Sequence, residues 1–375
     1  MKPHIFTLFL LVICLCTSCQ EKTPLQKALS SSSPAIQRVM SNPNKYEVQI
    51  IFSEIQRDTS SRVQFIDDEY QVNDNDYFYP ASTVKLPLAI LALEKINEYG
   101  VIGKDSQFQL EQDSIQTSIN KEINKSIIVS DNNAYNRLFE FVGKDEINEC
   151  LHSRGIRARI SHRLSTPKAD DTTSKSIVFK TNDSLVIIPR RKNSPAKPLQ
   201  LSSLNKGKGY IENGQLFNIP KDFSKKNYVP LRSLHSIMKR LIFPSTFPKT
   251  KQFKLRNSDR IDLLRIMEMV PRQYGYDPTT YPDNYVKFFV IGDQKGKKPK
   301  HLRIFNKVGL AYGYLIDCAY IKNELNQKEY LMSASVYVND NQIFNDDIYE
   351  YDDIGIPFLA ELGRQLIHHS GKNEK

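Results

Sequence analysis

The order of hydrophobic patterns along the chain constrains its fold more than any other feature of the sequence. Apolar and polar side chains alternate over residues 46–57, which predicts a strand, and residues 62–66 predict its partner. Helical patterns then fill the middle of the chain. Strand patterns return near its end, at 287–291, 302–308, 314–321 and 330–338. A helix at 357–369 closes the chain, so we expect an α+β fold whose antiparallel sheet comes from both chain ends, with an inserted helical subdomain.

The middle of the chain divides into helical stretches and one irregular stretch. Helices are predicted at 83–98, 120–128, 133–142, 144–153, 231–243 and 258–271. Residues 163–230 instead alternate short apolar runs with Pro, Gly, Asn and Lys, which predicts an irregular, partly extended insertion. We therefore expect one domain over 35–375. Its α/β part would be 35–80 with 280–375, and its helical part 81–279.

The first residues have the composition of an export signal. Lys2 precedes an apolar run of 11 residues, which is too short to span a membrane because a spanning helix needs about 20. Small residues directly before Cys19 are similar to a bacterial lipobox. This predicts a signal peptide at 1–18, a lipid anchor on Cys19, a tether at 19–34, and a place on the periplasmic or outer-membrane face of a bacterial envelope. The alternative is an ordinary signal peptide with an incidental cysteine.

Composition excludes several classes of protein. With 40% hydrophobic and 25% charged residues, the chain is neither disordered nor a multi-span membrane protein. Three of the five cysteines lie in the first 19 residues, so a disulfide scaffold is excluded, and no Cys or His spacing indicates a metal. The chain has a net charge of +10, but its basic patches lack the interleaved aromatic residues of a nucleic-acid-binding module. We expect no metal, no cofactor and no nucleic-acid partner.

Ser82 and Lys85 form the first candidate catalytic pair. Ser82 begins an apolar helical pattern, and positions i and i+3 share a helix face, so the lysine amine is expected beside the serine hydroxyl. A desolvated lysine can lose its proton and act as a base. The spacing alone is weak, because Ser-x-x-Lys occurs six times, starting at Ser82, Ser118, Ser165, Ser194, Ser203 and Ser236. Only the first copy opens an apolar helix after an aromatic loop.

Two further motifs follow along the chain. Ser130-Asp131-Asn132 occurs once, between two helical patterns, where its hydroxyl could relay a proton and its Asn amide could bind a substrate amide. The alternative is a helix cap, because all three residue types favour that position. Lys307-Val308-Gly309 lies on a predicted strand, and there the alternative is an ordinary edge-strand lysine.

These three motifs, in this order, resemble those of the class A β-lactamases and penicillin-binding proteins. The resemblance covers about 46–160 and 231–369 and implies a β-lactamase/transpeptidase-like fold. It implies that Ser82 is the nucleophile, that Lys85 deprotonates it, and that Ser130 passes the proton to the leaving nitrogen. It also implies that Asn132 binds the side-chain amide of the substrate, and that Lys307 binds the substrate carboxylate and Ser130. The backbone N–H groups of Ser82 and of Leu310, which follows Gly309, would bind the oxyanion.

The sequence departs from this family at two places. Val308 stands where the family has Thr or Ser, which removes a hydroxyl that would bind the carboxylate of a β-lactam. No glutamate lies between Glu149 and Glu212, although class A β-lactamases use a loop glutamate there to activate the deacylating water. Asp170 or Asp171 could substitute for it; the alternative is that both are solvated.

The leading hypothesis is an envelope-anchored serine hydrolase that a β-lactam or a related amide acylates at Ser82, with slow deacylation. One alternative is a peptidoglycan D-alanyl peptidase, which would take a peptidoglycan-like amide as substrate. The other is a non-catalytic cell-envelope binding lipoprotein, which the missing glutamate and Val308 favour modestly and the intact motifs oppose.

Overall fold

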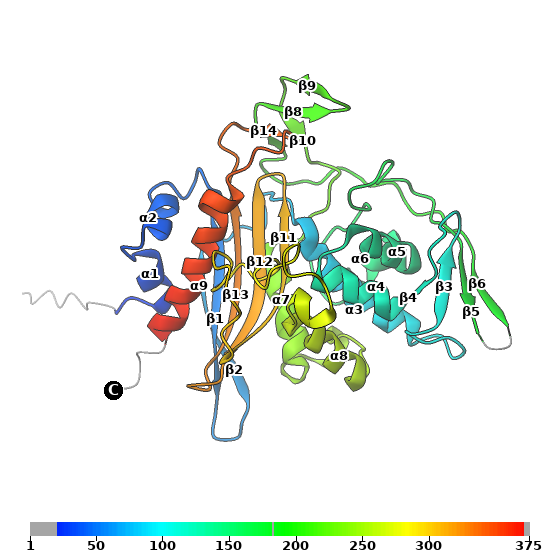
Figure 1. The fold of residues 1–375 in the computed structure, drawn as a ribbon, viewed down its shortest axis with the longest axis horizontal. Helices are drawn as coiled ribbons and strands as arrows, with labels where there is room; N and C mark the ends of the chain where they lie inside the picture. Colours follow the sequence, from blue (N-terminus) through cyan, green and yellow to red (C-terminus); the bar gives the residue numbers. More distant parts are fainter. Residues whose placement is uncertain (1–20, 182–183, 371–375) are drawn as a thin grey trace, which may run out of the picture.

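A five-stranded antiparallel sheet forms the centre of the computed structural model, which describes residues 21–181 and 184–370 (Figure 1). Its strand order is β11-β12-β13-β1-β2. The strands are β1 (Gln49–Arg57), β2 (Val63–Tyr70), β11 (Leu302–Ala311), β12 (Tyr314–Asn323) and β13 (Glu329–Tyr337). Two strands come from the start of the chain and three from its end, so the predicted sheet is confirmed.

Residues on β11 alternate between the two faces of this sheet, as a strand requires. Lys307 pairs with Cys318 of β12, whose side chain belongs to the core on the helical side. Val308 pairs with Asp317 and belongs to the core beneath α9 (Ile356–Ser370). The sheet therefore separates two cores, and Lys307 points from β11 toward the helical part.

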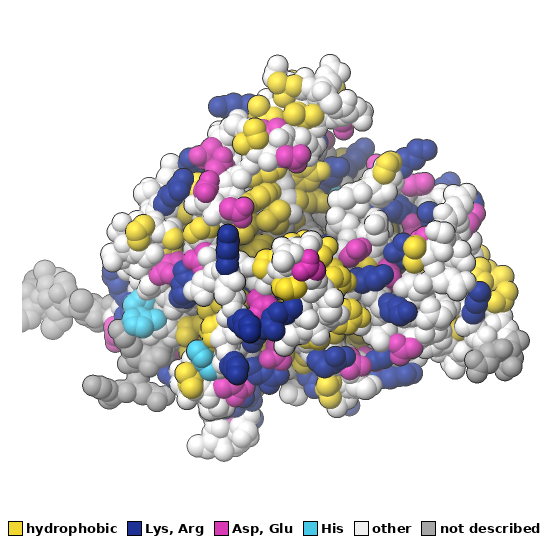
Figure 2. Space-filling model, in the orientation of Figure 1, with side chains coloured by type: hydrophobic (Ala, Val, Ile, Leu, Met, Phe, Trp, Pro, Cys, Tyr) yellow, Lys and Arg dark blue, Asp and Glu magenta, His cyan; other side chains and the backbone are white. Residues whose placement is uncertain are grey.

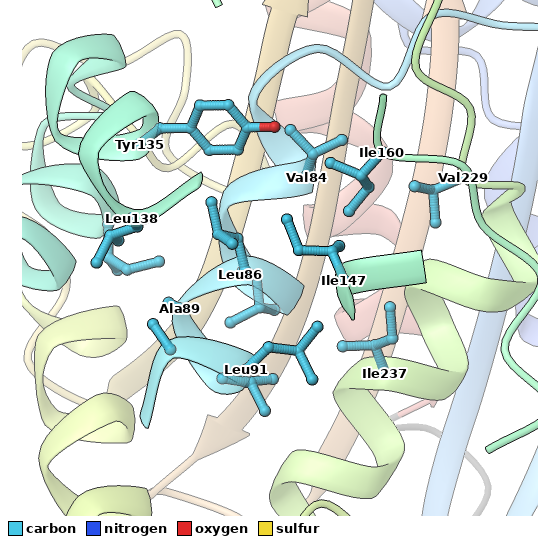
Figure 3. Packing of buried hydrophobic residues seen from close by; sticks show 14 of the residues in the cluster. Val84, Leu86, Ala89, Leu91, Tyr135, Leu138, Ile147, Ile160, Val229 and Ile237 are labelled. Atoms are coloured by element: carbon cyan, nitrogen blue, oxygen red, sulfur yellow. The ribbon is translucent and has the colours of Figure 1, made fainter. Parts of the chain in front are cut away.

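The helical part packs around α3 (Lys85–Ile96), whose residues are all buried. Figure 3 shows side chains of α3 surrounded by those of neighbouring helices and loops. The other helices on this side are α4 (Ile119–Ile128), α5 (Asn132–Val142), α6 (Lys144–Ser153), α7 (Leu231–Ile242) and α8 (Asn257–Glu268). Because α3 is buried on all sides, it lies at the centre of the helical part, and this fixes the position of the turn that precedes it.

The described part of the region 163–230 contains six short strands joined by irregular segments. Two of its strands join β3 and β4 in a four-stranded sheet, and the others form small sheets at the top of Figure 1 together with β14. The strands are β3 (Gln107–Leu110), β4 (Thr117–Ser118), β5 (Ile177–Lys180), β6 (Leu185–Ile188), β7 (Asn205–Lys206), β8 (Gly209–Glu212), β9 (Gln215–Phe217), β10 (Lys221–Asp222) and β14 (Ile343–Phe344). Short 3-10 turns lie at Ala81–Val84, Pro244–Thr246, Lys249–Lys251 and Pro271–Tyr274, and a π-helical turn at Tyr351–Gly355.

The expected tether is wrong for its described part. Residues Pro24–Leu29 form helix α1, and α2 (Pro34–Met40) follows directly. Both helices pack beside α9 (Figure 1), where Leu25 and Ala28 are buried. The prediction failed because a helix of six residues is too short to show a clear hydrophobic period, and its two apolar side chains have a partner only in the tertiary structure. Cys19 and the predicted signal peptide lie outside the described residues.

We expect Leu25→Ala to destabilise the protein by about 2–3 kcal/mol, because it removes a fully buried side chain from the contact between α1 and α9. Thermal unfolding followed by circular dichroism measures this change. Lys22→Ala, at an exposed position just before α1, is the control. Equal melting temperatures for both variants would show that α1 contributes nothing to the stability of the fold.

The predicted strand at 287–291 is also wrong. These residues are buried but form turns. The backbone N–H groups of Phe288 and Phe289 donate to the Asp317 carboxylate, at 3.1 and 3.0 Å, instead of to a neighbouring strand. Residues 288–291 are apolar because they are buried, and an apolar run does not distinguish a strand from a buried turn.

In the part of the chain that the structure describes, no helix is both long and apolar enough to cross a bilayer.

Candidate active site

Ser82 lies on a tight turn between an aromatic loop and the central helix. Ala81 has a φ of +46°, an unfavourable backbone conformation for a non-glycine residue, and such strain is common at functional turns. Ser82 then falls in the 3-10 turn that leads into α3. Residues i and i+3 of a 3-10 turn are eclipsed, so Lys85 is aligned with Ser82, and its Nζ donates to Ser82 Oγ at 2.8 Å.

The Lys85 amine lies at the centre of the candidate site. Its Nζ also contacts Ser130 Oγ at 3.1 Å, the Ser130 carbonyl oxygen at 2.5 Å and Asn132 Oδ1 at 2.6 Å. The side chain is fully buried. Burial, assisted by the nearby charge of Lys307, holds the pKa of Lys85 well below the usual lysine range. A neutral amine bonded to a serine hydroxyl can accept the proton of that serine.

Ser130 and Asn132 are positioned by the turn between α4 and α5. Ser130 has a φ of +57°, which turns its side chain and its carbonyl oxygen toward Lys85. Asp131 is the N-cap of α5 and accepts from the Ala134 N–H at 2.7 Å. The helix-cap interpretation of this tripeptide is therefore correct for Asp131, while its two neighbours face the lysine.

Lys307 reaches the same serine from the sheet. Its Nζ donates to Ser130 Oγ at 2.9 Å and to the Val308 carbonyl at 3.0 Å. Burial lowers the pKa of Lys307 to about 7, because the attraction of Asp317 offsets the desolvation only in part. Ser130 Oγ thus links two lysines of reduced basicity, which is an arrangement suited to passing a proton.

Strand β11 approaches the Ser82 turn closely at Gly309. A Cβ atom on Gly309 would lie 2.7 Å from the Pro80 carbonyl oxygen and 3.1 Å from side-chain carbons of Ala81 and Thr83. Only glycine permits this spacing. It brings the backbone of Leu310 next to Ser82, and both residues line the same cavities.

We expect Gly309→Ala to slow acylation of Ser82 at least about tenfold, because the strand has to shift away from the turn at an overpacking cost of about 1–3 kcal/mol. The second-order acylation rate and the melting temperature, measured together, test this. Gly296→Ala, which has open space around its Cβ, is the matched control. An unchanged acylation rate in Gly309→Ala would show that the close approach is dispensable.

Two cavities open on either side of Ser82, Asn132 and Leu310. We call the first, of about 600 Å³, the insertion-side cavity, since residues of the insertion such as Ser165 and Lys226 line it together with Tyr312 and Asp347. We call the second, of about 450 Å³, the α9-side cavity. Ser130, Val308, Phe288 and Asp352 line it. Figure 2 shows hydrophobic side chains gathered in a hollow at the centre of the molecule, over β11 and β12.

The loop expected to hold a water-activating glutamate has a serine beside the site. Ser165 Oγ accepts from Asn132 Nδ2 at 2.9 Å, and both residues line the insertion-side cavity. Asp170 and Asp171 are exposed and do not line this cavity, so neither takes the place of the glutamate. Among the residues lining it, Asp347 is the one carboxylate, and it lies on the loop after β14 rather than on the insertion.

Several residues at the site had no signal in the sequence. Tyr349 and Tyr351 line the insertion-side cavity, and the adjacent Asp352 lines the α9-side cavity. They belong to the segment between β14 and α9, which reads only as a polar turn followed by a helix start. Its position above Ser82 depends on tertiary packing, where Tyr351 accepts from the Gly313 N–H at 2.7 Å.

A second buried polar cluster supports β11 from the opposite face. Lys287 Nζ donates to Asn306 Oδ1 at 2.7 Å, and Asn306 Nδ2 donates to Asp317 Oδ1 at 2.8 Å. Burial raises the pKa of Asp317 to about 6 and lowers that of Lys287 to about 7. This cluster ties the 286–289 turn to the strand that carries Lys307. Within the described ranges, no group of three His, Cys, Asp or Glu side chains could hold a metal ion.

Comparison with known proteins gives a fold for most of the chain and a family likeness for part of it. The model of the β-lactamase enzyme family matches residues 32–190, which include Ser82, Lys85, Ser130 and Asn132 but not Lys307. A search of curated proteins found no significant match.

Solved structures extend the likeness over most of the chain. A class A β-lactamase of Bacteroides cellulosilyticus is 14% identical, with a TM-score of 0.54, over 94% of this chain and 100% of that one. A β-lactamase of Xanthomonas campestris is 14% identical, with a TM-score of 0.52, over 89% of this chain and 97% of that one. A mutant of PBP-A, solved as an acyl-enzyme complex with penicillin G, is 14% identical, with a TM-score of 0.52, over 94% of this chain and 97% of that one.

The match over residues 32–190 and the arrangement around Ser82 make this part of the chain similar to the β-lactamase enzyme family. The chain shares the fold of the class A β-lactamases and of the penicillin-binding-protein-like enzymes, as the three sequence motifs predict.

Proposed function

We propose that a β-lactam or a related amide acylates this protein at Ser82 and that the acyl-enzyme is long-lived. The observation that carries the proposal is the buried Lys85 amine, which is bonded to both Ser82 Oγ and Ser130 Oγ and has a strongly lowered pKa. The two hydroxyls and the amine between them form a continuous path for a proton.

Acylation follows this path. Ser82 Oγ attacks the carbonyl carbon while its proton moves to the neutral Lys85 Nζ. The oxyanion accepts hydrogen bonds from the backbone N–H groups of Ser82 and Leu310. The Lys85 proton then passes through Ser130 Oγ to the leaving nitrogen as the C–N bond breaks, and an ester on Ser82 remains. Lys307 holds the Ser130 hydroxyl in place. Asn132, whose Nδ2 faces Ser165, provides an amide for the acyl side chain.

Deacylation lacks a base on the insertion, because the one carboxylate among the described residues lining the insertion-side cavity, Asp347, lies on the loop after β14. Hydrolysis of the ester needs a water molecule that is activated on the side of the insertion, where Ser165 occupies the expected place and no glutamate is present. A serine hydroxyl is too weak a base for this step at neutral pH. Slow turnover follows, so we expect the protein to accumulate as the acyl-enzyme.

Two alternatives share the same geometry. A peptidoglycan D-alanyl peptidase would use Ser82 in the same way on a stem peptide. A non-catalytic binding lipoprotein is favoured by the missing glutamate and by Val308, but it gives no reason for a strained turn and a buried lysine pair beside Ser82.

Labelling with a fluorescent penicillin tests the proposal. We expect a covalent label on the wild-type protein and none on Ser82→Ala. A label on both variants places acylation elsewhere. The absence of label on the wild type, combined with equilibrium binding of cell-wall fragments, supports the binding lipoprotein. A label that vanishes within seconds indicates an efficient β-lactamase instead.

We also propose that the protein is anchored to the bacterial envelope through a lipid on Cys19. The small residues before this cysteine support the proposal, as does the short apolar run, which fits a cleaved signal. Incorporation of labelled palmitate by the producing cells measures it. Label in the wild type and none in Cys19→Ala is the expected result, and equal label in both would contradict it.

A further inference from the structure

We propose that the α9-side cavity is the leaving-group subsite and that it selects uncharged or cationic leaving groups over carboxylates, with Asp352 as the specificity-determining residue. This inference rests on the proposed acylation of Ser82, and it gives the substrate a chemical character that the three motifs alone do not supply.

The position of Ser130 identifies the leaving-group side. In the proposed reaction the leaving nitrogen receives its proton from Ser130 Oγ, which contacts both Lys85 and Lys307. Ser130 lines the α9-side cavity and not the insertion-side cavity. The leaving group therefore departs into the α9-side cavity, and the acyl side chain extends toward the insertion.

The walls of this cavity suit an apolar or cationic group. Val286, Phe288 and Ile356 line it together with Val308 and Leu310, whose side chain is 42% exposed. Asp352 is the one charged side chain among the described residues that line the cavity. Its carboxylate attracts a cation and repels an anion across a space that apolar walls make less polar than water.

A second acceptor lies in the same wall. Asn284 donates through Nδ2 to the Gly292 carbonyl at 2.6 Å, which fixes the orientation of its amide. Its Oδ1 is buried and has no hydrogen-bond partner among the described residues. Because neighbouring atoms cover this oxygen, the preference against a carboxylate rests on Asp352 and not on Asn284.

The cavity has few positive charges or hydrogen-bond donors that could stabilise a carboxylate. No lysine or arginine is among its described lining residues, and Val308 presents a hydrocarbon side chain. Lys307 lies behind Ser130 and is already bonded to Ser130 Oγ and to a carbonyl. With a pKa of about 7, it is only partly charged at neutral pH. A desolvated carboxylate without donors is strongly disfavoured.

Three phenyl esters with one common acyl group test the inference. Their phenol leaving groups carry a meta carboxylate, a meta carboxamide or a meta aminomethyl group, and the burst of phenol release gives each acylation rate. We expect the aminomethyl ester to acylate the wild-type protein at least about tenfold faster than the carboxylate ester, the size expected for one partly screened charge. The carboxamide ester should fall between them.

Asp352→Asn should reduce the ratio of the aminomethyl to the carboxylate acylation rate by about tenfold. The acylation rate with the carboxamide ester should stay within about twofold of the wild-type rate. Asp353→Asn is the matched control, because Asp353 is also exposed but does not line the cavity. A carboxylate ester that reacts as fast as the others, or an unchanged ratio in Asp352→Asn, would overturn the inference alone. Equal phenol release by the wild type and Ser82→Ala would overturn the proposed function as well.

Discussion

Replacing Lys85 with methionine should slow acylation of Ser82 by about 10²–10⁴-fold, the contribution typical of a positioned general base. Methionine has a similar length and is apolar, so it fills the buried space while removing the amine that bonds Ser82 and Ser130. The second-order rate of covalent adduct formation with a penicillin, followed by intact mass, measures the effect.

The pH dependence of this rate distinguishes a base from a structural group. Burial lowers the pKa of Lys85, so acylation should rise with pH as Lys85 loses its proton, in a range well below the usual lysine pKa. This rise should be absent in Lys85→Met. Lys95→Met is the control, because Lys95 is a buried lysine of the same helix whose Nζ bonds to the Val142 carbonyl instead. A loss of acylation in Lys95→Met of similar size would indicate disruption of α3 instead of loss of the base.

Introducing a carboxylate at Ser165 should speed deacylation by about 10–100-fold. Ser165 lines the insertion-side cavity next to Ser82 and bonds Asn132, so a glutamate there can accept a proton from water beside the ester. General-base catalysis by a positioned carboxylate commonly contributes factors of this size or larger. Loss of the preformed adduct over time, after removal of free penicillin, gives the deacylation rate of Ser165→Glu.

Thr173→Glu is the matched control for this variant. Thr173 is an exposed residue of the same insertion that does not line the cavity at Ser82, so the added charge should leave the adduct lifetime unchanged. Equal deacylation by Ser165→Glu and the wild type would mean that the missing glutamate is not what limits turnover.

The parts of the fold with strong periodicity were predictable from the sequence. The strands at the two ends of the chain and α7 were located within a few residues. Elements stabilised only by tertiary contacts were not. Helix α1 has six residues, and Leu25 of that helix is buried only because α9 covers it. The apolar residues 287–291 look like a strand, but the Asp317 carboxylate takes their backbone N–H groups.

The same distinction applies to the site. Ser82 and Lys85 could be paired from their i, i+3 spacing, whereas Ser130, Asn132 and Lys307 could be proposed because the three motifs, in this order, resemble those of the class A β-lactamases and penicillin-binding proteins. The structure brings Ser82, Lys85, Ser130 and Lys307 into one hydrogen-bonded group, although they lie up to 225 positions apart, from 82 to 307. Asp352 and Asn284 carry no such pattern. Their place at the α9-side cavity depends on how the π-helical turn and the 282–292 turns pack against β11.

The lifetime of the adduct on Ser82 tests the central claim most directly. The wild-type protein is acylated with excess penicillin, the free compound is removed, and intact mass is recorded over hours, with peptide mapping of the modified serine. We expect an adduct on Ser82 that persists over this period. An adduct on another residue, or one lost as fast as it forms, would contradict it.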